Sequence, residues 1–506
     1  MNKSINRVLL DHEILFSYIR NNQNGLKSLE SDLFEHFKKE QVLLSMSSVS
    51  LINKSVKSEY PALIDDLFVF YNRLTLISPP NWIDWNNKLV KQDFDAYLLG
   101  LAADSVDACI LTERKSVFMY SDRAVSLDTL RATVREQEPL FPFLDLKQQY
   151  LSINQDIDHA INSVIGTSSF IGGKSLKNFE DNFARYLDAD YCVGVGNGTD
   201  AIEIALEALN LPPGSEVIVP ANTFIATSEA VTRCGLRVVF CDCDEHNYTI
   251  DIKDAKKRIS GKTRAIVAVH LYGHPADVDS LKEIADEQGI KIIEDCAQAH
   301  GAEYKGQKVG ALCDLGTFSF YPGKNLGAYG DGGAIVTNNT ELAEKCRMIA
   351  NHGRISKYDH QFEGRNSRLD TLQAAILNVK LQYLEKWTTQ RIAIADTYLE
   401  QLSDCRDIVL PKREEWARQV YHLFVIRAKQ RDELRKYLDN HNIQTGIHYP
   451  IALPKLEAYT YVNQQNDRMF ANTMDNELLS LPIGEHLSVN DAVLISERIK
   501  EFFCNG

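Results

Sequence analysis

Short apolar runs alternate with helical patterns through the second part of the chain. The runs are YCVGVG, EVIVP, RVVFCD, RAIVAVHL, KIIEDCA, GTFSFY and GAIVT. Stretches with helical periodicity, such as GTDAIEIALEALN and DVDSLKEIADEQG, separate several of them. This alternation is typical of an α/β fold with a buried, mostly parallel central sheet. Because ligands of such sheets bind beyond the carboxyl ends of the strands, we expect the chemistry in the loops that follow these runs.

The length of the chain, 506 residues, exceeds what one hydrophobic core usually organises and predicts several domains. The segment RATVREQEPLFPFLDL is charged and then carries Pro139 and Pro142, as a junction between domains often does. We therefore expect a separate N-terminal accessory domain, α/β or rich in helices, at 1–136 and a large α/β domain at 137–386. A long helical pattern, followed by YHLFVIRA and RDELRKYLDNHN, predicts a small C-terminal α+β subdomain at 387–506.

Charge and hydropathy narrow the class of protein. Acidic residues outnumber basic residues by 69 to 55, and the net charge of −14 argues against non-specific binding to nucleic acid or to an anionic membrane. The N-terminus MNKSINRVLLDHEILFSYIR has no apolar signal-peptide core, and no run approaches the ~20 apolar residues of a membrane helix. We therefore expect a cytoplasmic protein without a membrane partner.

The ten cysteines form no CxxC pair and have no zinc-type spacing. This pattern favours reduced thiols over a disulfide framework, and we expect no metal site. Cys241 and Cys243 are alternate residues in VVFCDCDEHNY, which predicts that both lie on one face of a strand.

Two of the loops place small or aromatic residues at the start of a helix. In GVGNGTDAIEIAL, Gly198 and Thr199 open the helix, and free N–H groups beside a hydroxyl make an anion site there. The spacing does not match GxGxxG, so a structural turn is the competing interpretation. In PANTFIATSEA, Phe224 follows the run EVIVP. Its ring can stack on a flat cofactor, and a plain core position is the alternative.

A third loop follows the Ile-rich run KIIED, which ends in Glu294 and Asp295, with Gln298 and His300 just beyond. A carboxylate at this point can be an ordinary cap. It can also hold a protonated ring nitrogen, because hydrogen bonds to charged groups are stronger than neutral ones.

The fourth loop places Lys324 among glycines in TFSFYPGKNLGAYGDGGAIVT, with Ser319 before it. The lysine can be a solvated loop residue, a phosphate ligand or a nucleophile. Together the four loops supply an acid for a pyridine nitrogen, an aromatic ring for stacking, hydroxyl and amide groups for a phosphate, and one lysine for a Schiff base. This set is what pyridoxal 5'-phosphate requires.

The chain from about Phe141 onward resembles the nucleotide-sugar aminotransferases of the DegT/DnrJ/StrS type. The matching blocks are FIGGKSLKNFE, GVGNGTDAIEIAL, PANTFIATSEA, VHLYGHPADV, IIEDCAQAHGA, FSFYPGKNLGAYGDGGAIVT, GRNSRLDTLQAAIL and GIHYP. The resemblance implies the aspartate-aminotransferase fold (type I), pyridoxal 5'-phosphate as the cofactor, and homodimers with shared active sites.

The resemblance also implies roles for single residues. Lys324 would bind the cofactor covalently, and Asp295 would pair with its pyridine nitrogen. The other cofactor contacts implied are Gln298 beside the ring hydroxyl, Phe224 at the stacking position, Gly198, Thr199 and Ser319 on the phosphate, and Asn366 on the phosphate of the neighbouring subunit's cofactor. The residues expected on the sugar side are His300, Tyr321 and His448.

The reaction implied by the resemblance is transamination with L-glutamate as the amino donor and a nucleotide-linked keto sugar as the acceptor. The motifs look most similar to those of FdtB- and QdtB-like enzymes, which act at C3 of a dTDP-3-keto-6-deoxyhexose. The product would be a dTDP-amino sugar for a surface polysaccharide such as lipopolysaccharide O-antigen. A C4-specific aminotransferase, a dehydratase and a regulatory protein are the alternatives. The dehydratases of the family carry histidine at the position of Lys324, which favours transamination.

The N-terminal segment has no counterpart in that family. The order of its patterns faintly resembles PIN-like domains, in which separated acids bind a divalent metal for RNA cleavage. Asp11, Asp95 and Glu113 would then be the ligands, since hard cations prefer such oxygens. The segment has no clear basic patch for RNA, so an accessory domain for docking or assembly is the preferred interpretation.

Overall fold

The computed structural model describes residues 141–465 and 468–504, together with the backbone of a few short strands between residues 8 and 125. The chain divides into two compact units, Met1–Pro139 and Leu140–Gly506. The division falls within the segment that the sequence predicts as a junction.

The first unit contains a five-stranded parallel sheet in the order β3-β2-β1-β4-β5. Its strands are β1 (Val8–Leu10), β2 (Val42–Ser45), β3 (Thr75–Ile77), β4 (Cys109–Leu111) and β5 (Ala124–Val125). The acids Asp11, Asp95 and Glu113 lie outside the described residues. The PIN-like interpretation of this unit therefore stays a prediction.

The second unit is built on a seven-stranded sheet in the order β6-β14-β13-β10-β9-β7-β8. The strands are β6 (Tyr191–Val195), β7 (Glu216–Pro220), β8 (Arg237–Cys241), β9 (Thr263–Val269), β10 (Lys291–Asp295), β13 (Leu315–Ser319) and β14 (Gly333–Thr337). Within this sheet β14 alone runs against its neighbours, and the other pairs are parallel. The prediction of a mostly parallel sheet from the apolar runs is confirmed.

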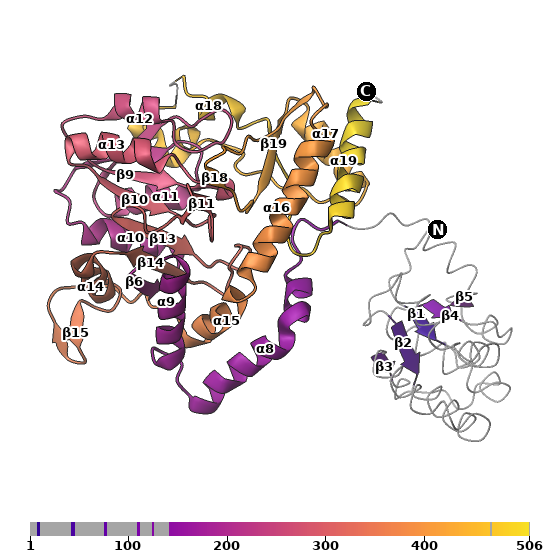
Figure 1. Ribbon diagram of the computed structural model, residues 1–506, viewed down its shortest axis with the longest axis horizontal. Coiled ribbons are helices and arrows are strands. Elements are labelled where there is room, and N and C mark those ends of the chain that lie inside the picture. Colours follow the sequence, from indigo (N-terminus) through magenta and orange to yellow (C-terminus); the bar gives the residue numbers. More distant parts are fainter. Residues whose placement is uncertain are drawn as a thin grey trace. The chain divides into compact units, whose positions relative to one another are not determined.

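Helices cover both faces of this sheet (Figure 1). One face packs against α10 (Gly198–Ala208), α11 (Ile225–Arg233) and α14 (Thr340–Ile349). The other face packs against α9 (Lys174–Tyr186), α12 (Ile252–Arg258), α13 (Val278–Gln288) and α15 (Thr371–Leu381). The long helix α8 (Leu146–Thr167) packs on α15. The sheet is thus buried on both sides, which is why apolar residues follow one another along its strands.

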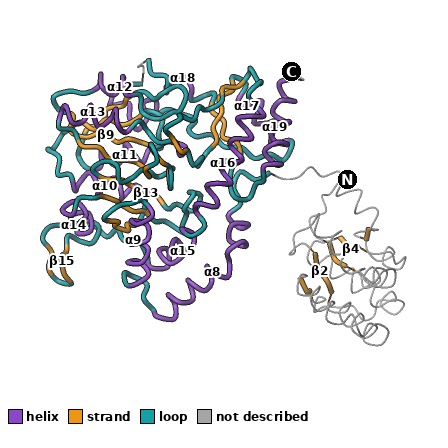
Figure 2. The backbone as a smooth tube through the Cα atoms, in the orientation of Figure 1, coloured by secondary structure: helices purple, strands orange, loops and turns teal. Residues whose placement is uncertain are grey.

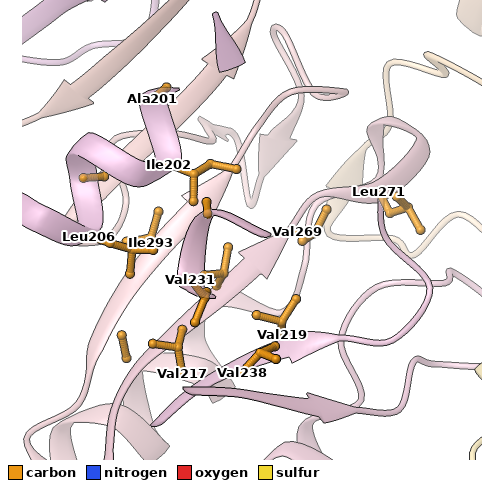
Figure 3. Packing of buried hydrophobic residues seen from close by; sticks show 14 of the residues in the cluster. Ala201, Ile202, Leu206, Val217, Val219, Val231, Val238, Val269, Leu271 and Ile293 are labelled. Atoms are coloured by element: carbon orange, nitrogen blue, oxygen red, sulfur yellow. The ribbon is translucent and has the colours of Figure 1, made fainter. Parts of the chain in front are cut away.

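Side chains along the strands alternate between the two faces. Figure 3 shows Val217 and Val219 of β7 in one cluster with Leu206 of α10 and Val231 of α11. The residue between the two valines, Ile218, packs into the cluster on the opposite face. This alternation is the pleat of a strand that contributes to two cores.

The prediction for the paired cysteines is wrong. The strand β8 ends at Cys241, and Cys243 lies beyond it in an isolated bridge with Ile250. Cys241 packs into the cluster that includes α12 and α13, whereas Cys243 packs into the cluster with α10 and α11. The spacing rule fails because the chain leaves the regular strand between them. The cysteines of the described residues are free thiols.

The C-terminal part combines helices with a small antiparallel sheet in the order β17-β19-β20. Its elements are α16 (Leu384–Gln401), β17 (Ile408–Val409), β19 (Phe424–Ala428), α17 (Arg431–Asn440), β20 (Leu478–Leu481) and α19 (Val489–Cys504). Figure 2 shows α16 leading to the region of α17 and α19, and its Ile394 and Tyr398 pack against Phe424 and Ile426 of β19.

The remaining elements are short. They are β11 (Glu303–Tyr304), β12 (Gln307–Lys308), β15 (Arg354–Ser356), β16 (Asp359–His360), β18 (Ala417–Arg418), α18 (Ala471–Met474) and the 3-10 turns Leu271–Gly273, Leu453–Lys455 and Glu457–Val462. Among the described residues, no helix has the length and apolar character needed to cross a membrane.

Candidate active site

The carboxyl ends of the parallel strands bring the predicted residues to one edge of the sheet. Asp295 ends β10 and Ser319 ends β13, and these strands are paired neighbours. The strand β6 leads into α10, whose first residue is Gly198, and β7 leads into α11, whose N-cap is Phe224. Lys324 lies between β13 and β14. The four loops singled out in the sequence therefore meet at the edge where ligands of such sheets bind.

Asp295 is buried and accepts two hydrogen bonds from the protein. Its Oδ2 accepts from the hydroxyl of Thr227 at 2.8 Å, and its Oδ1 accepts from the N–H of Ala297 at 3.1 Å. Burial raises the pKa of the Asp295 carboxyl, while both hydrogen bonds and the nearby Lys324 ammonium act against the rise. A buried carboxylate is stable when it is paired, so this position favours a cationic ligand.

Lys324 lies on a tight turn. Its N–H donates to the carbonyl of Tyr321 at 2.9 Å, and the N–H of Ala328 donates to the carbonyl of Phe320 at 2.8 Å. Within the turn, a Cβ on Gly327 would lie 2.3 Å from the carbonyl oxygen of Pro322, so only glycine fits. The glycines therefore allow the sharp bend that carries the lysine.

The Lys324 amine has unusual acid–base properties. Burial lowers its pKa from 10.5 to about 8, although the carboxylate of Asp295 favours the charged form. An amine with this pKa has a substantial neutral, nucleophilic fraction near neutral pH.

We expect the reactivity of Lys324 in the cofactor-free protein to follow this pKa. Its rate of modification by acetic anhydride should rise about tenfold per pH unit up to about pH 8 and then level off, because the neutral amine is the reacting form. Peptide mass spectrometry after short reactions measures the rate at this lysine. A rate that keeps climbing to 10.5, the ordinary lysine value, would contradict the assignment.

Gly198 and Ser319 form a close contact at the start of α10. A Cβ on Gly198 would lie 2.6 Å from the Cβ of Ser319 and 3.1 Å from its Oγ. The side chain of Asn197 caps the helix by accepting from the N–H of Asp200 at 2.8 Å. The N–H groups of Gly198 and Thr199 precede this cap bond and have no carbonyl one turn earlier to accept them. The first N–H groups of α10 and the Ser319 hydroxyl thus lie close together, an arrangement that binds phosphate in other proteins and that we call the phosphate cradle.

Replacing Gly198 by alanine tests this cradle. We expect Gly198→Ala to lower the free energy of unfolding by about 1–3 kcal/mol, because the new methyl overlaps Ser319, and to weaken phosphate binding. Urea unfolding and titration with inorganic phosphate measure the two effects. Gly166 in α8 is the matched control, since a Cβ there meets nothing within 4 Å, and Gly166→Ala should stabilise by up to ~1 kcal/mol. Equal effects of both substitutions would contradict the cradle.

An aromatic platform lies beside the buried acid. Phe224 is 53 % exposed, which does not fit the core alternative, and its ring centroid lies 5.6 Å from that of Tyr449. The side-chain amide of Gln298 donates to the Tyr449 hydroxyl at 3.0 Å and accepts from the N–H of Tyr272 at 2.7 Å. Gln298 is therefore fixed in orientation at the edge of the platform.

The residues expected on the sugar side occupy different environments. Tyr321 is 60 % exposed. His448 is partly buried, its Nδ1 lies 2.9 Å from the Oγ of Ser480, and its ring stacks on Phe143 with centroids 5.8 Å apart. Burial lowers the pKa of His448 to about 4, and Lys324 acts in the same direction. A neutral His448 near the lysine remains compatible with a place beside the substrate.

His300 is fully buried, which does not favour the expected contact with a sugar. Its ring packs against Phe318 and Phe320 with centroid distances of 5.5 Å and 5.8 Å. Burial, together with a smaller effect of the Lys324 ammonium, lowers the pKa of His300 to about 3. We interpret His300 as a neutral ring that packs behind the lysine.

Asn366 is exposed. Asn366 forms an isolated bridge with Asn351, and the hydroxyl of the next residue, Ser367, accepts from the N–H of Gly196 at 3.0 Å. Its position at the surface is compatible with a contact to a second subunit.

The sequence did not single out several residues that organise this edge. They include Thr227, Tyr449 and Lys380. Lys380 of α15 is almost fully buried, and its Nζ donates to the carbonyl of Gly327 at 2.8 Å. The same Nζ lies 4.2 Å from the centroid of the Tyr329 ring, so α15 holds the turn that carries the catalytic candidate. A lysine within the apolar pattern TLQAAILNVKL was the available signal.

A buried cluster next to Asp295 contains His270, Glu294 and Cys296. Glu294 accepts four hydrogen bonds, from the N–H groups of residues 310, 312 and 313 and from the ring of His270. The acceptor sites of the carboxylate are thereby used, so the cluster fixes a loop and offers a metal little.

The geometry at this edge can now be compared with known proteins. The sequence profile of the DegT/DnrJ/EryC1/StrS aminotransferase family matches residues 151–500. The chain belongs to this family. The match begins beyond the first compact unit.

This aminotransferase resembles several characterised proteins. It is 43 % identical over 369 residues to the dTDP-3-amino-3,4,6-trideoxy-alpha-D-glucose transaminase of Streptomyces venezuelae, covering 73 % of this chain and 97 % of the relative. It is 44 % identical over 363 residues to the dTDP-3-amino-3,6-dideoxy-alpha-D-galactopyranose transaminase of Aneurinibacillus thermoaerophilus, covering 72 % and 99 %. The erythromycin biosynthesis sensory transduction protein EryC1 of Saccharopolyspora erythraea is 45 % identical over 348 residues, covering 69 % and 95 %.

Solved structures give the same assignment for the fold. DesV of S. venezuelae matches the aminotransferase with a TM-score of 0.71 and 43 % identity, covering 72 % of this chain and 98 % of DesV. NtdA from Bacillus subtilis, solved with bound cofactor PMP, matches with a TM-score of 0.66 and 32 % identity, covering 71 % and 85 %. The predictions of an aminotransferase, of its fold and of pyridoxal phosphate as its cofactor are confirmed.

Proposed function

We propose that this aminotransferase moves an amino group from L-glutamate to C3 of a dTDP-linked 3-keto-6-deoxyhexose. The product would be a dTDP-amino sugar for a surface polysaccharide such as lipopolysaccharide O-antigen. The names of two relatives, each of which specifies a dTDP-3-amino sugar, support this class of substrate. The observation that carries the proposal is the amine of Lys324, with its pKa lowered to about 8, beside the buried carboxylate of Asp295.

The residues present fit the cofactor. Pyridoxal 5'-phosphate, when bound, supplies a carbonyl for the amino group and a ring that accepts the electrons of a substrate carbanion. Asp295 would hold the pyridine nitrogen in its protonated form, and Lys324 would bind the cofactor and carry the proton between carbon atoms. Gly198 lets the start of α10 lie against Ser319, where a larger residue would overlap the serine, so the helix N–H groups and the Ser319 hydroxyl would together hold the phosphate. Phe224 would cover one face of the ring.

The enzyme is proposed to act as a homodimer with shared active sites. Asn366 lies at the surface of the described residues, and it would contact the phosphate of the neighbouring subunit's cofactor. We propose further that the first unit is an accessory domain for docking or assembly, without a chemical role in the transfer.

The test of the proposal uses the purified full chain, L-glutamate and separate dTDP-3-keto and dTDP-4-keto 6-deoxyhexoses. We expect release of 2-oxoglutarate with the 3-keto sugar, and NMR of the product should place the new amine on C3. Amination of the 4-keto sugar alone would replace the C3 assignment by C4.

Two controls sharpen this experiment. The same keto sugar without its nucleotide should not be turned over, because the nucleotide supplies binding energy. Regulation is the second candidate function, favoured by the name of EryC1. It would be preferred if the loaded protein bound the nucleotide sugars but released no 2-oxoglutarate with any of them.

A further inference from the structure

Two threonine hydroxyls form a chain behind the buried acid. The Oγ1 of Thr227 lies 2.8 Å from Asp295 Oδ2, and the Oγ1 of Thr223 lies 3.1 Å from the Oγ1 of Thr227. The exposed fractions of these three residues are 1 % for Thr227, 4 % for Thr223 and 5 % for Asp295. Because all three side chains are buried, the direction of the hydrogen bonds among the two hydroxyls and the carboxylate is set by these protein groups and not by solvent.

The direction of the chain depends on the charge of Asp295. A carboxylate only accepts hydrogen bonds, and each hydroxyl has one proton to donate. When Asp295 is ionised, the Thr227 hydroxyl must donate its hydrogen bond to Oδ2. The Thr223 hydroxyl must then donate to the oxygen of Thr227. When Asp295 is protonated, Thr227 is free to accept instead. When Asp295 is charged, the hydrogen bonds of the two hydroxyls can therefore run in only one direction, from Thr223 to Thr227 to Asp295. In a buried site such successive hydrogen bonds polarise and strengthen one another.

The two threonines lie on either side of Phe224, which belongs to the aromatic platform. Thr223 precedes the N-cap residue Phe224, and Thr227 lies in the first turn of α11. The N-terminal end of a helix favours negative charge nearby. The start of α11 thereby connects Phe224 of the aromatic platform to the carboxylate of Asp295.

We propose that Thr227, backed by Thr223, is a positioning residue for aminotransfer, whose hydroxyl chain keeps Asp295 ionised and oriented toward the pyridine nitrogen. This inference rests on the role proposed for Asp295. Burial raises the pKa of Asp295, and the Thr227 hydrogen bond is one of the contacts that oppose it.

The test is the affinity of pyridoxamine 5'-phosphate, which binds without a covalent link to Lys324, measured by equilibrium dialysis. Thr227→Val keeps the shape of the side chain and removes the donor, and we expect it to weaken binding by roughly 10- to 100-fold. Thr227→Ser keeps the donor and should bind within about threefold of the parent. Thr223→Val should have a smaller effect of the same sign. The same affinity in the Val and Ser variants would overturn the proposal.

A matched control and a double variant separate this effect from general damage. Thr388 in α16 is fully buried, and its hydroxyl has no hydrogen-bond partner among the described residues, so Thr388→Val should leave the affinity unchanged. Thr227→Val should weaken the binding of pyridoxamine 5'-phosphate much less in the Asp295→Asn background than in the parent, because the amide carries no charge to stabilise. The proposal would be overturned if Thr227→Val weakened the binding by the same factor in both backgrounds.

The outcome is distinguishable from a failure of the proposed function. Binding of pyridoxamine 5'-phosphate requires neither glutamate nor a sugar, so a wrong substrate would leave the result intact. If Asp295→Asn itself left the affinity unchanged, the role of Asp295 would fail, and the proposal about Thr227 with it. As a spectroscopic check, the ¹⁵N shift of ring-labelled cofactor should move toward the unprotonated value in Thr227→Val and should stay unchanged in Thr227→Ser.

Discussion

Lys324→Ala is expected to abolish covalent attachment of the cofactor and to reduce turnover by at least roughly 10³-fold. The methyl group offers neither a nucleophile nor a base, and a proton carrier at this point contributes much of the rate. Intact mass after borohydride reduction should show an added cofactor on the parent and none on the variant. Release of 2-oxoglutarate from L-glutamate gives the rate of the first half of the reaction.

The control for this substitution is an exposed lysine on the same unit. Lys253 lies on α12, and Lys253→Ala should leave both the mass increment and the rate unchanged. Retention of the reducible cofactor by Lys324→Ala would assign the attachment to another amine. Buried Lys380 would be the first to examine, since burial lowers its pKa to about 8 as well.

Asp295→Asn is expected to lower the rate of amino transfer by roughly 10²- to 10³-fold, the range for removing one preorganised electrostatic contact. A neutral amide cannot stabilise the positive charge of a protonated pyridine nitrogen. The free energy of unfolding of the cofactor-free protein should instead rise or stay constant. Burial disfavours the charged carboxylate, and an isosteric neutral group avoids that cost.

Two measurements on the same sample check this opposition, the rate of 2-oxoglutarate release and the midpoint of urea unfolding. The matched control is Asp279→Asn, which breaks an exposed ion pair with Lys305. It should change the free energy of unfolding by less than about 1 kcal/mol and leave the rate unaffected. A large loss of stability in Asp295→Asn would show instead that the carboxylate mainly holds the fold together.

Several features of the site follow from the chain order alone. Apolar runs without alternation identify a sheet buried on both faces, and four of the seven runs are followed by a loop that carries a functional candidate. Lys324 and Asp295 were singled out because the four loops together supply the groups that pyridoxal 5'-phosphate requires, although a cap or a solvated loop residue would explain each of them alone. The alternation of side chains along a strand predicted both cysteines on one face, and this prediction failed because β8 ends before Cys243.

The contacts between the loops could not be predicted from the sequence and became evident only in the folded structure. The contact of Gly198 with Ser319, the hydroxyl of Thr227 on Asp295 and the amine of Lys380 on Gly327 join segments that are far apart in the chain. Such pairs leave no local pattern, because their spacing reflects how the strands are ordered in the sheet.

The alternation of apolar runs and helical patterns predicted the fold class, and the sequence motifs indicated the family. The roles of Lys324 and Asp295 stay predictions that rest on those motifs. The burial of His300 and the exposure of Phe224 became evident only in the folded structure. Burial and pKa depend on every group that surrounds a side chain in space, and a linear pattern does not contain those neighbours.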